Sequence, residues 1–588
     1  MRARTFLRHH VDLRAASVRA ERRTCRDLEE ALGGIARALR LLEECEVTDP
    51  CAPGAPLVCN LGALSGTPVM TGLRTFFSGF SPLKVSRGGV SAPMWSAGSD
   101  RFGVHLRALG VEEILLTGRA GAPTVLVVER GPAFRFESGA DLLGLTVNGK
   151  IQALARRFPG AHFAVIGPAG EHWQAVRYAA IALSTENQIR SGDCKPRFCG
   201  RGGFGGVMGS KNLLAIVATE PDRLPAAAPA LKALNLEVAR GDGSRRYRDA
   251  DKGNGAGGTW FLYEALGPVH ALPECNFTTT GTVASGALAR PAVEAHTEVR
   301  DESCFRCGIA CHKNAYGPDG FSAKIDYEPL NLLGSNLGIF EFDAVAALIA
   351  LVDEMGLDSI SCGATLSYAM EYNRRHPGAP VAEGLSFGDA RGAARAIRAV
   401  AEGRLPQLGQ GVRRLAEETR EGGYAMECKG VELPAYLPHT NPGYPFALAG
   451  GHMSMRTYLL LMFERETGLD YWVDAITRRG PMILRDDLLG VCKFGGMKDE
   501  AMSEALREAA GIEATADELR RAVLRTHLRG YRLERRLGFT EEDYDPPAAA
   551  HERLPPLELP HFLTRGFHVE LKRRVLARFD EMLAEEGL

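Results

Sequence analysis

Three cysteines lie within eight residues, Cys304, Cys307 and Cys311, in the spacing C-x2-C-x3-C. Turns between them can fold the backbone around one metal centre, so that the three thiolates converge. A cubane iron–sulfur cluster takes four cysteines, and a remote fourth would complete it. The sequence has no second C-x2-C pair to form a zinc ribbon, although His312 follows Cys311 directly and could be a zinc ligand. The spacing therefore favours an iron–sulfur cluster, with zinc as the alternative.

Two segments share the pattern D-x-x-G-[LV]-[DC], and they begin at Asp353 and Asp487. A carboxylate can accept two parallel N–H bonds from a flat heterocycle with an amino group beside a ring N–H. The glycine lets the chain pass close to such a ring. Either segment alone would be a helix C-cap glycine after an acidic turn. The pair, with Cys492 at the end of the second segment, favours two binding sites for one kind of ligand.

A glycine-rich stretch, 197–212, precedes an apolar run that we predict as a strand. Backbone N–H groups in such a loop can approach an anion closely, and Arg197 and Arg201 add positive charge. The loop precedes a strand instead of leading from a strand into a helix, which is the wrong order for a dinucleotide fingerprint. It also lacks the Gly-Lys-Ser/Thr of a nucleoside-triphosphate loop. A phosphate-binding loop and a merely flexible loop are equally compatible with this pattern.

The elements that must position these residues divide the chain into three parts. Residues 1–217 alternate short β-like runs, such as 124–128, with breaks rich in Gly and Pro. Residues 218–430 and 431–588 are mainly helical, with apolar residues at 3–4 spacing in stretches such as 342–354. No repeat of 20–50 residues is evident. We predict an α+β multidomain fold in which a β-rich N-terminal domain is followed by two mainly α-helical domains.

Composition excludes several classes of protein. The 588 residues carry 70 Lys+Arg and 72 Asp+Glu, so that the net charge of −2 gives no global attraction for nucleic acid. No run approaches the ~18 apolar residues needed to cross a bilayer, and the N-terminus lacks the apolar segment of a secretory signal. The 13 cysteines are an odd number, which does not fit a purely paired disulfide framework. We expect a cytoplasmic protein with no nucleic-acid or membrane partner, whose cysteines bind metal or act in catalysis.

Together these motifs resemble the tungsten-containing aldehyde:ferredoxin oxidoreductase family. The matching pieces occur in the family's order over about residues 55 to 545, and they comprise Leu61–Pro68 with Arg74 for G-P-L-T-G-T…R, Gly200–Val217 for G-R-G-G-x-G-x-V-M-G-S-K-N-L-K-A-I, the three cysteines, Tyr327–Asn336 for Y-E-…-L-G-S/P-N, and the two D-x-x-G segments. Cys492 matches the family's distant fourth cluster ligand. The combination is specific, although no single piece is.

The resemblance implies a set of cofactors. One tungsten, or molybdenum, would be held by dithiolene sulfurs from two pterins, with Mg2+ bridging the pterin phosphates. A [4Fe–4S] cluster would take Cys304, Cys307, Cys311 and Cys492. The first domain would form the base of the cofactor. The residues expected at the pterins or their phosphates are Arg74, Arg197, Gly200, Arg201, Gly202, Asp353, Leu357, Asp358, Asp487 and Val491.

The resemblance also implies a reaction, the oxidation of a small aldehyde to a carboxylate. Electrons would pass through the cluster to ferredoxin or to an iron–sulfur electron-transfer subunit. Glu328 occupies the position of a carboxylic acid that could orient water or the carbonyl and move a proton. The family's histidine near the metal has no direct counterpart, because alignment on Met455–Tyr458 puts Ser454 there. His452 and His439 are the candidate substitutes.

The sequence departs from the family pattern at two further places. The segment 95–102, which contains Asp100, replaces the family's N-S-G-G-x-F beside the pterin. Ala347 stands where some members have an acidic residue for a subunit-bridging iron, so we predict no such iron, although a homodimer remains compatible with the sequence. Two other functions stay open: a family member that reduces an acid or an aromatic acyl thioester, and a tungsten-free iron–sulfur electron-transfer protein.

Overall fold

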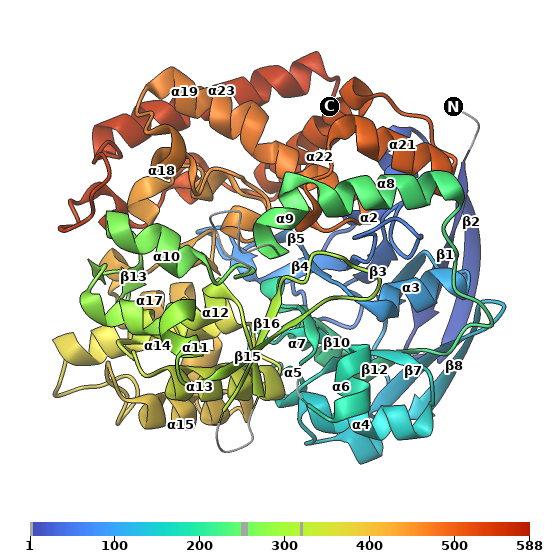
Figure 1. Cartoon of the computed structure of the whole chain (residues 1–588), viewed down its shortest axis with the longest axis horizontal. Coiled ribbons are helices and arrows are strands. Elements are labelled where there is room, and N and C mark those ends of the chain that lie inside the picture. The colour runs from blue at the N-terminus through green and yellow to red at the C-terminus, as the bar shows by residue number, and fades with distance from the viewer. Residues whose placement is uncertain (1–3, 194, 249–256, 318–321) are drawn as a thin grey trace.

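The computed structural model describes residues 4–193, 195–248, 257–317 and 322–588. Strands gather in the N-terminal part of the chain, at the right of Figure 1, and the later parts are mainly helical. Most of the middle part lies at the lower left, although its first helix, α8 Pro229–Arg240, lies at the upper right, and the last part lies across the top. This arrangement confirms the predicted fold class, a β-rich first domain followed by helical ones.

Within the described residues, the first domain contains two six-stranded sheets that repeat one topology. The first sheet has the order β2-β1-β6-β3-β4-β5 and the second β8-β7-β12-β9-β10-β11, so that each strand has a counterpart six strands later. In both sheets one pair is parallel, β1–β6 and β7–β12, and the other pairs are antiparallel. The strands are β1 Thr5–Asp12, β2 Ser17–Thr24, β3 Leu57–Leu61, β4 Thr75–Val85, β5 Ser91–Gly98, β6 Glu113–Thr117, β7 Thr124–Glu129, β8 Ala133–Ser138, β9 His162–Ile166, β10 Ile181–Leu183, β11 Arg197–Cys199 and β12 Leu213–Ala218.

The helices of the first domain follow the same duplication. After β5 the chain passes through Asp100 into α3, and after β11 it passes through Gly202 into α7. Both residues adopt a left-handed φ, 94° for Asp100 and 84° for Gly202. A glycine takes this conformation without cost, whereas an aspartate is strained there. The helices are α1 Leu28–Leu32, α2 Gly34–Glu43, α3 Arg101–Ala108, α4 Val147–Arg157, α5 Pro168–Glu171, α6 Glu186–Ser191 and α7 Phe204–Ser210.

The middle part surrounds a small three-stranded sheet with helices. The strands are β15 Glu298–Glu302, β16 His312–Tyr316 and β17 Ser322–Ile325, and the three clustered cysteines lie on the connection between β15 and β16. The predicted helix 342–354 is confirmed as α13. The longer helices are α8 Pro229–Arg240, α9 Asp242–Arg248, α12 Tyr327–Leu332, α13 Phe342–Met355, α14 Ser359–Arg375, α15 Ala390–Ala401 and α17 Val412–Thr419; the short α10 Leu262–Leu266, α11 Arg290–Glu294 and α16 Pro406–Gly409 complete them.

The last part begins with an irregular run of single 3-10 turns after β18 Glu427–Cys428 and β19 Val431–Glu432. Its helices then return to the first domain, where α22 contacts α1 and α2. They are α18 Leu460–Glu464, α19 Leu469–Asp474, α20 Leu484–Leu489, α21 Asp499–Ala510, α22 Ala516–Arg536 and α23 Arg565–Glu585. No single helix of the described residues is long and apolar enough to cross a membrane; the pair Tyr327–Leu337 and Phe342–Met355 meets that test only together, with a bend of 120°.

Candidate active site

The first D-x-x-G segment joins the second sheet of the first domain through its backbone. Gly356 ends α13 with a left-handed φ of 71°. Next to it, the amide of Asp358 donates to the carbonyl of Tyr178 at 2.9 Å, and Leu357 forms an isolated bridge with Ala179. A Cβ on Gly356 would come within 2.7 Å of the amide nitrogen of Gly167, which directly follows β9. Only glycine permits this approach.

The second D-x-x-G segment makes the equivalent contact with the first sheet. Gly490, with a φ of 80°, ends α20, and its carbonyl accepts the amide of Arg74 at 3.1 Å. After Val491, the amide of Cys492 donates to the carbonyl of Thr71 at 3.0 Å. A Cβ on Gly62, the residue directly after β3, would lie 2.4 Å from the amide nitrogen of Gly490. Each segment therefore pairs with one half of the duplicated domain, which agrees with two sites for one kind of ligand.

The two motif aspartates are in different electrostatic states. Asp487 accepts a hydrogen bond from Lys493 Nζ at 2.9 Å and another from Trp95 Nε1 at 3.2 Å. The side chain of Asp353 forms no hydrogen bond or ion pair within the described residues, and burial raises its pKa to about 7 although Lys324 opposes the shift. A half-buried carboxylate without a partner costs free energy. Asp353 therefore fits a site that a donor-rich ligand completes.

The glycine-rich loop meets the first D-x-x-G segment through Arg201. Its Nε lies 3.2 Å from Asp358 Oδ2, and its Nη2 donates to the carbonyl of Glu432 at 2.7 Å. Its Nη1 and Nε of Arg197 are both buried, and neither has a hydrogen-bond partner among the described residues. Buried cationic donors of this kind favour an anionic or carbonyl-rich ligand. The observed donors thus fit the predicted pterin or phosphate contact, beside Gly200 and Gly202.

Lys493 and Ser361 also belong to this site, although the sequence alone did not single them out. Ser361 donates to Asp358 Oδ2 at 2.7 Å and lies 2.6 Å from Glu432 Oε2. Lys493 follows Cys492 directly, and its position beside a motif cysteine and a motif aspartate is the signal that could have identified it.

The four predicted cluster cysteines converge on one region. Cys492 comes from the second D-x-x-G segment, and Arg74 Nη2 donates to its Sγ at 3.3 Å. Burial, together with the nearby Cys304 and Cys492, raises the pKa of Cys307 to about 12. Burial and the same neighbours also raise the pKa of Cys311. Thiols that burial and their neighbours keep protonated need a cationic metal centre to become thiolates.

The two metal alternatives need different ligand sets. A structural zinc ion takes four His, Cys or carboxylate ligands, whereas a cubane cluster takes four cysteine thiolates. Within the described residues, no group of three or more His, Cys, Asp or Glu side chains is close enough to hold a single metal ion. His312 meets Arg197 at Nδ1, and its Nε2 lies 3.5 Å from Cys304 Sγ. The four cysteines supply the ligand set of a cubane cluster.

Glu328 and His452 face each other. Glu328 is the second residue of α12; its Oε2 accepts the amide of Ala435 at 2.7 Å, while its Oε1 lies 3.5 Å from His452 Nε2. Burial raises the pKa of Glu328 to about 7. Burial, with Arg201 and Lys493, lowers the pKa of His452 to about 3, so the imidazole is neutral. A carboxyl poised near neutral pH is suited to proton transfer.

Of the two candidate histidines, the structure brings only His452 to Glu328. His439 is buried in a separate turn, and its pKa falls to about 4 through burial and the neighbouring His561 and His551. The aromatic rings around His452 belong to Tyr436, at 5.7 Å between ring centroids, and Tyr458, at 5.5 Å. These rings cover much of the carboxyl and the imidazole, whose side chains are 16% and 14% exposed.

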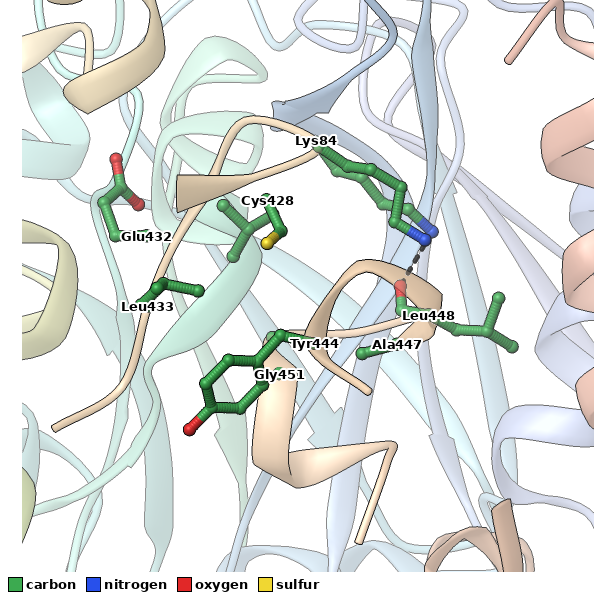
Figure 2. Close-up of a pocket in the computed structure, with 11 residues that line it drawn as sticks. Lys84, Cys428, Glu432, Leu433, Tyr444, Ala447, Leu448 and Gly451 are labelled. Atoms are coloured by element: carbon green, nitrogen blue, oxygen red, sulfur yellow. Dashed lines mark hydrogen bonds between the residues drawn. The ribbon is translucent and has the colours of Figure 1, made fainter. Parts of the chain in front are cut away.

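A small cavity lies beside this group, between the turn at Gly450 and the segment 428–433 (Figure 2). The buried side chain of Tyr444 lines the cavity. Figure 2 shows the Lys84 side chain at the opposite end, where its Nζ donates to the carbonyl of Leu448 at 2.7 Å. The cavity is lined by Lys84, Cys428, Lys429, Val431, Glu432, Leu433, Tyr444, Ala447, Leu448, Gly450 and Gly451.

Asp353→Asn is expected to stabilise the cofactor-free protein. The folded-state pKa of Asp353, about 7, exceeds the ordinary value of 3.8, so the folded state binds more protons and loses stability as pH rises from about 4 to about 7. Asparagine removes that loss, and we expect a gain of roughly 1–3 kcal/mol above pH 7. Thermal unfolding at pH 5 and pH 8 checks this, with the larger gain at pH 8. A lower melting temperature for the variant at pH 8 would contradict it.

The comparisons with known proteins agree with this fold. The N-terminal domain of aldehyde ferredoxin oxidoreductase matches residues 8–220, and domains 2 and 3 of that enzyme match residues 244–585. The chain therefore belongs to the aldehyde ferredoxin oxidoreductase family. The match confirms the resemblance drawn from the motifs, and the match to this tungsten-enzyme family implies a tungstopterin.

Individual relatives include tungsten-containing enzymes of Pyrococcus species. The chain is 32% identical over 68% of its length to the tungsten-containing aldehyde ferredoxin oxidoreductase of Pyrococcus abyssi, and it spans 65% of that protein. It is 31% identical to the enzyme of the same name from Pyrococcus furiosus, over 71% of this chain and 67% of that protein. It is 28% identical, over 68% of this chain and 62% of that protein, to a second Pyrococcus furiosus protein, the WOR-like subunit of an aliphatic sulfonate oxidoreductase.

A solved structure shares the whole fold. It is the active-site complex BamBC of benzoyl coenzyme A reductase with 1,5-dienoyl-CoA, and the superposition has a TM-score of 0.75 with 19% sequence identity. It covers 99% of this chain and 98% of the other. At this identity the likeness concerns the fold alone.

Proposed function

We propose that this chain is a tungstopterin iron–sulfur oxidoreductase that oxidises an aldehyde to a carboxylate. The observation that carries the proposal is that the second D-x-x-G segment contains both a proposed pterin-binding aspartate and a proposed cluster ligand. Asp487 and Cys492 belong to one short stretch, and Arg74 contacts Cys492 Sγ at 3.3 Å. A ligand held by Asp487 and a cluster held by Cys492 would thus be neighbours, with a short path for electrons.

The chain's own residues would hold the cofactors as follows. Asp353 and Asp487 would accept N–H groups of the two pterins, and Arg201 with the loop amides would bind carbonyl or phosphate oxygens. Mg2+ is expected beside those phosphates. When bound, the tungsten centre and the [4Fe–4S] cluster would supply two-electron and one-electron redox chemistry.

Glu328 and His452 would handle protons in the reaction. The Glu328 carboxylate would accept a proton from water as its oxygen adds to the aldehyde carbon. Neutral His452, whose Nε2 lies 3.5 Å from Glu328 Oε1, would hold that carboxyl in place or hydrogen-bond the aldehyde oxygen. The surrounding tyrosine rings would limit access of bulk water.

The electron acceptor that we propose is ferredoxin or a related iron–sulfur subunit. The cluster loop carries exposed Arg306, and Arg101 and Arg306 stack on Phe305 at 4.3 and 4.8 Å from the ring centroid. This local positive charge suits an acidic protein even though the chain's net charge is close to zero.

A second candidate reaction is the reduction of an aromatic acid or acyl thioester. The rings of Tyr327, Tyr436 and Tyr458 form a connected group beside Glu328 and His452, with centroid distances of 5.4 and 4.8 Å. Aromatic faces of this kind favour an aromatic substrate. The same Glu328 would then supply a proton instead of accepting one.

Metal analysis of anaerobically purified protein, with Cys492→Ala as the partner variant, tests the proposal. The parent is expected to contain about one tungsten or molybdenum and about four iron per chain. The variant loses a cluster ligand, so its iron and its visible absorbance should fall sharply while the chain stays folded. A screen of aldehydes with an electron-accepting dye follows.

Zinc alone in the parent would refute the proposal. Unchanged iron in Cys492→Ala would refute the role of that cysteine. Iron without tungsten or molybdenum would favour an electron carrier, and turnover of acyl thioesters but not aldehydes would favour the second reaction.

A further inference from the structure

The histidine that follows the third cluster cysteine is held between an arginine and a cluster thiol. His312 opens β16 and is buried, with 5% of its surface exposed. On one side of the ring, Arg197 contacts Nδ1; on the other side, Nε2 lies 3.5 Å from Cys304 Sγ. Neither the glycine-rich loop nor the cysteine spacing predicted this contact, because Arg197 was expected at a pterin or phosphate.

The arginine fixes which ring nitrogen carries the proton. A guanidinium has only donors, so the atom it contacts must be an acceptor. Nδ1 therefore has no proton, and the single proton of the neutral ring sits on Nε2. That N–H points at Cys304 Sγ. The assignment follows from the two contacts alone.

We infer that His312, positioned by Arg197, donates an Nε2–H···S hydrogen bond to Cys304 and thereby raises the reduction potential of the cluster. The inference rests on the proposed [4Fe–4S] cluster. The reduced cluster carries one more negative charge, which its sulfurs share, so a donor to a ligand sulfur stabilises the reduced state more than the oxidised one. Arg74 makes the corresponding contact with Cys492 at 3.3 Å, so two of the four proposed ligands receive a donor.

Arg197 positions the His312 ring and also hydrogen-bonds Cys304 itself, whereas His312 supplies the Nε2–H donor. The arginine leaves the glycine-rich loop at β11, whereas the histidine and Cys304 belong to the β15–β16 connection. The contact therefore links the loop expected at the pterin to the loop that holds the cluster. A change at Arg197 would release the ring, and a proton on Nδ1 would then leave Nε2 as an acceptor.

Two substitutions at position 312 distinguish the effect of the hydrogen-bond donor from the effect of side-chain packing. His312→Gln can place an amide N–H near the position of Nε2, whereas His312→Asn is too short to reach Cys304 and keeps only the Arg197 side. We expect the midpoint potential of the cluster in the complete, anaerobically purified protein to be more negative in His312→Asn than in the parent. His312→Gln should stay close to the parent, and Arg197→Met should shift in the same direction as His312→Asn.

A matched control is His105, a buried histidine of the same protein whose Nδ1 lies 3.2 Å from the carbonyl of Thr219 and which makes no contact with the four cysteines. His105→Asn should leave the potential unchanged. In ordinary water the reduced parent should also show a proton that is coupled to the cluster spin and that deuterated water replaces with a deuteron. His312→Asn should lack this coupling.

Several outcomes would overturn the inference. Equal potentials for His312→Asn, His312→Gln and the parent would mean that the hydrogen bond does not tune the cluster. Failure of both variants to retain iron while the parent retains it would make His312 a folding residue. A parent that binds no cluster at all would instead refute the proposed function, which is a separate result.

Discussion

Glu328→Gln is expected to lower kcat/KM for aldehyde oxidation by about 10²–10⁴-fold, the usual contribution of a positioned acid–base group. Glutamine keeps the shape of the side chain and can still accept the amide of Ala435, which lies 2.7 Å from Glu328 Oε2. It cannot accept a proton from water at neutral pH. Steady-state rates with a dye acceptor measure the effect, and metal analysis shows whether the variant still binds its cofactors.

The pH dependence gives a second test of the same residue. Burial raises the pKa of Glu328 to about 7. A base must be ionised to act, so kcat/KM of the parent should rise about tenfold per pH unit below 7 and level off above it. The Gln variant should lack this rise. If the reaction in use were instead a reduction, with Glu328 as the acid, the parent's rate would fall as pH rises through 7.

Glu264 on α10 provides a matched control for this experiment. Burial also raises the pKa of its carboxyl, and none of its described hydrogen bonds or ion pairs involves Glu328 or His452. Glu264→Gln should leave both the rate and its pH profile unchanged. Full activity in Glu328→Gln, or an equal loss in both variants, would contradict a proton-transfer role for Glu328.

Local patterns predicted much of this architecture. Apolar runs identified β7 and β12, and helical spacing identified α13, to within a residue or two. Both strands bury consecutive residues on both faces, and α13 buries its apolar residues. The duplicated topology was not predicted. β10 has three residues where its counterpart β4 has eleven, so no sequence period marks the two halves.

Site residues that belong to short sequence motifs could be predicted, whereas those that depend on long-range packing could not. The cysteines and the two D-x-x-G segments could be found from spacing. The choice between His452 and His439 could not, because it depends on how an irregular run of turns packs against α12. The sequence also did not predict that Asp487 has a charged partner and Asp353 has a raised pKa, because only the fold brings Lys493 to Asp487.

The largest effect on stability is expected from Glu534→Gln, since it removes the one carboxylate of a buried charge cluster. Glu534 on α22 is 1% exposed, and its Oε1 lies 2.6 Å from Lys84 Nζ of β4 and 3.0 Å from Lys429 Nζ. The hydroxyl of Tyr544 donates to Oε2 at 2.9 Å. The cluster joins the β-rich first domain to both later parts of the chain, at the end of the cavity in Figure 2 where Lys84 lies.

Removing one partner of a buried ion pair typically costs about 3–5 kcal/mol, because the remaining charge stays buried without compensation. Here two ammonium groups would lose their counter-charge together. Burial already lowers the pKa of Lys84 to about 8, and only Glu534 opposes this shift. In the variant we expect Lys84 to lose its proton at a lower pH, so the destabilisation should be smaller at pH 9 than at pH 6.

Thermal unfolding of the parent, Glu534→Gln, Lys84→Met and the double variant decides how the cluster acts. Lys84→Met should cost less than Glu534→Gln, because Lys429 still balances Glu534. The double variant should be more stable than the sum of the two changes predicts, since it leaves one fewer unpaired ammonium. Glu570→Gln, which breaks the exposed pair with Arg573 on α23, is the matched control and should leave the melting temperature unchanged. Strict additivity, or an equal effect at Glu570, would show that the buried cluster does not hold the three parts of the chain together.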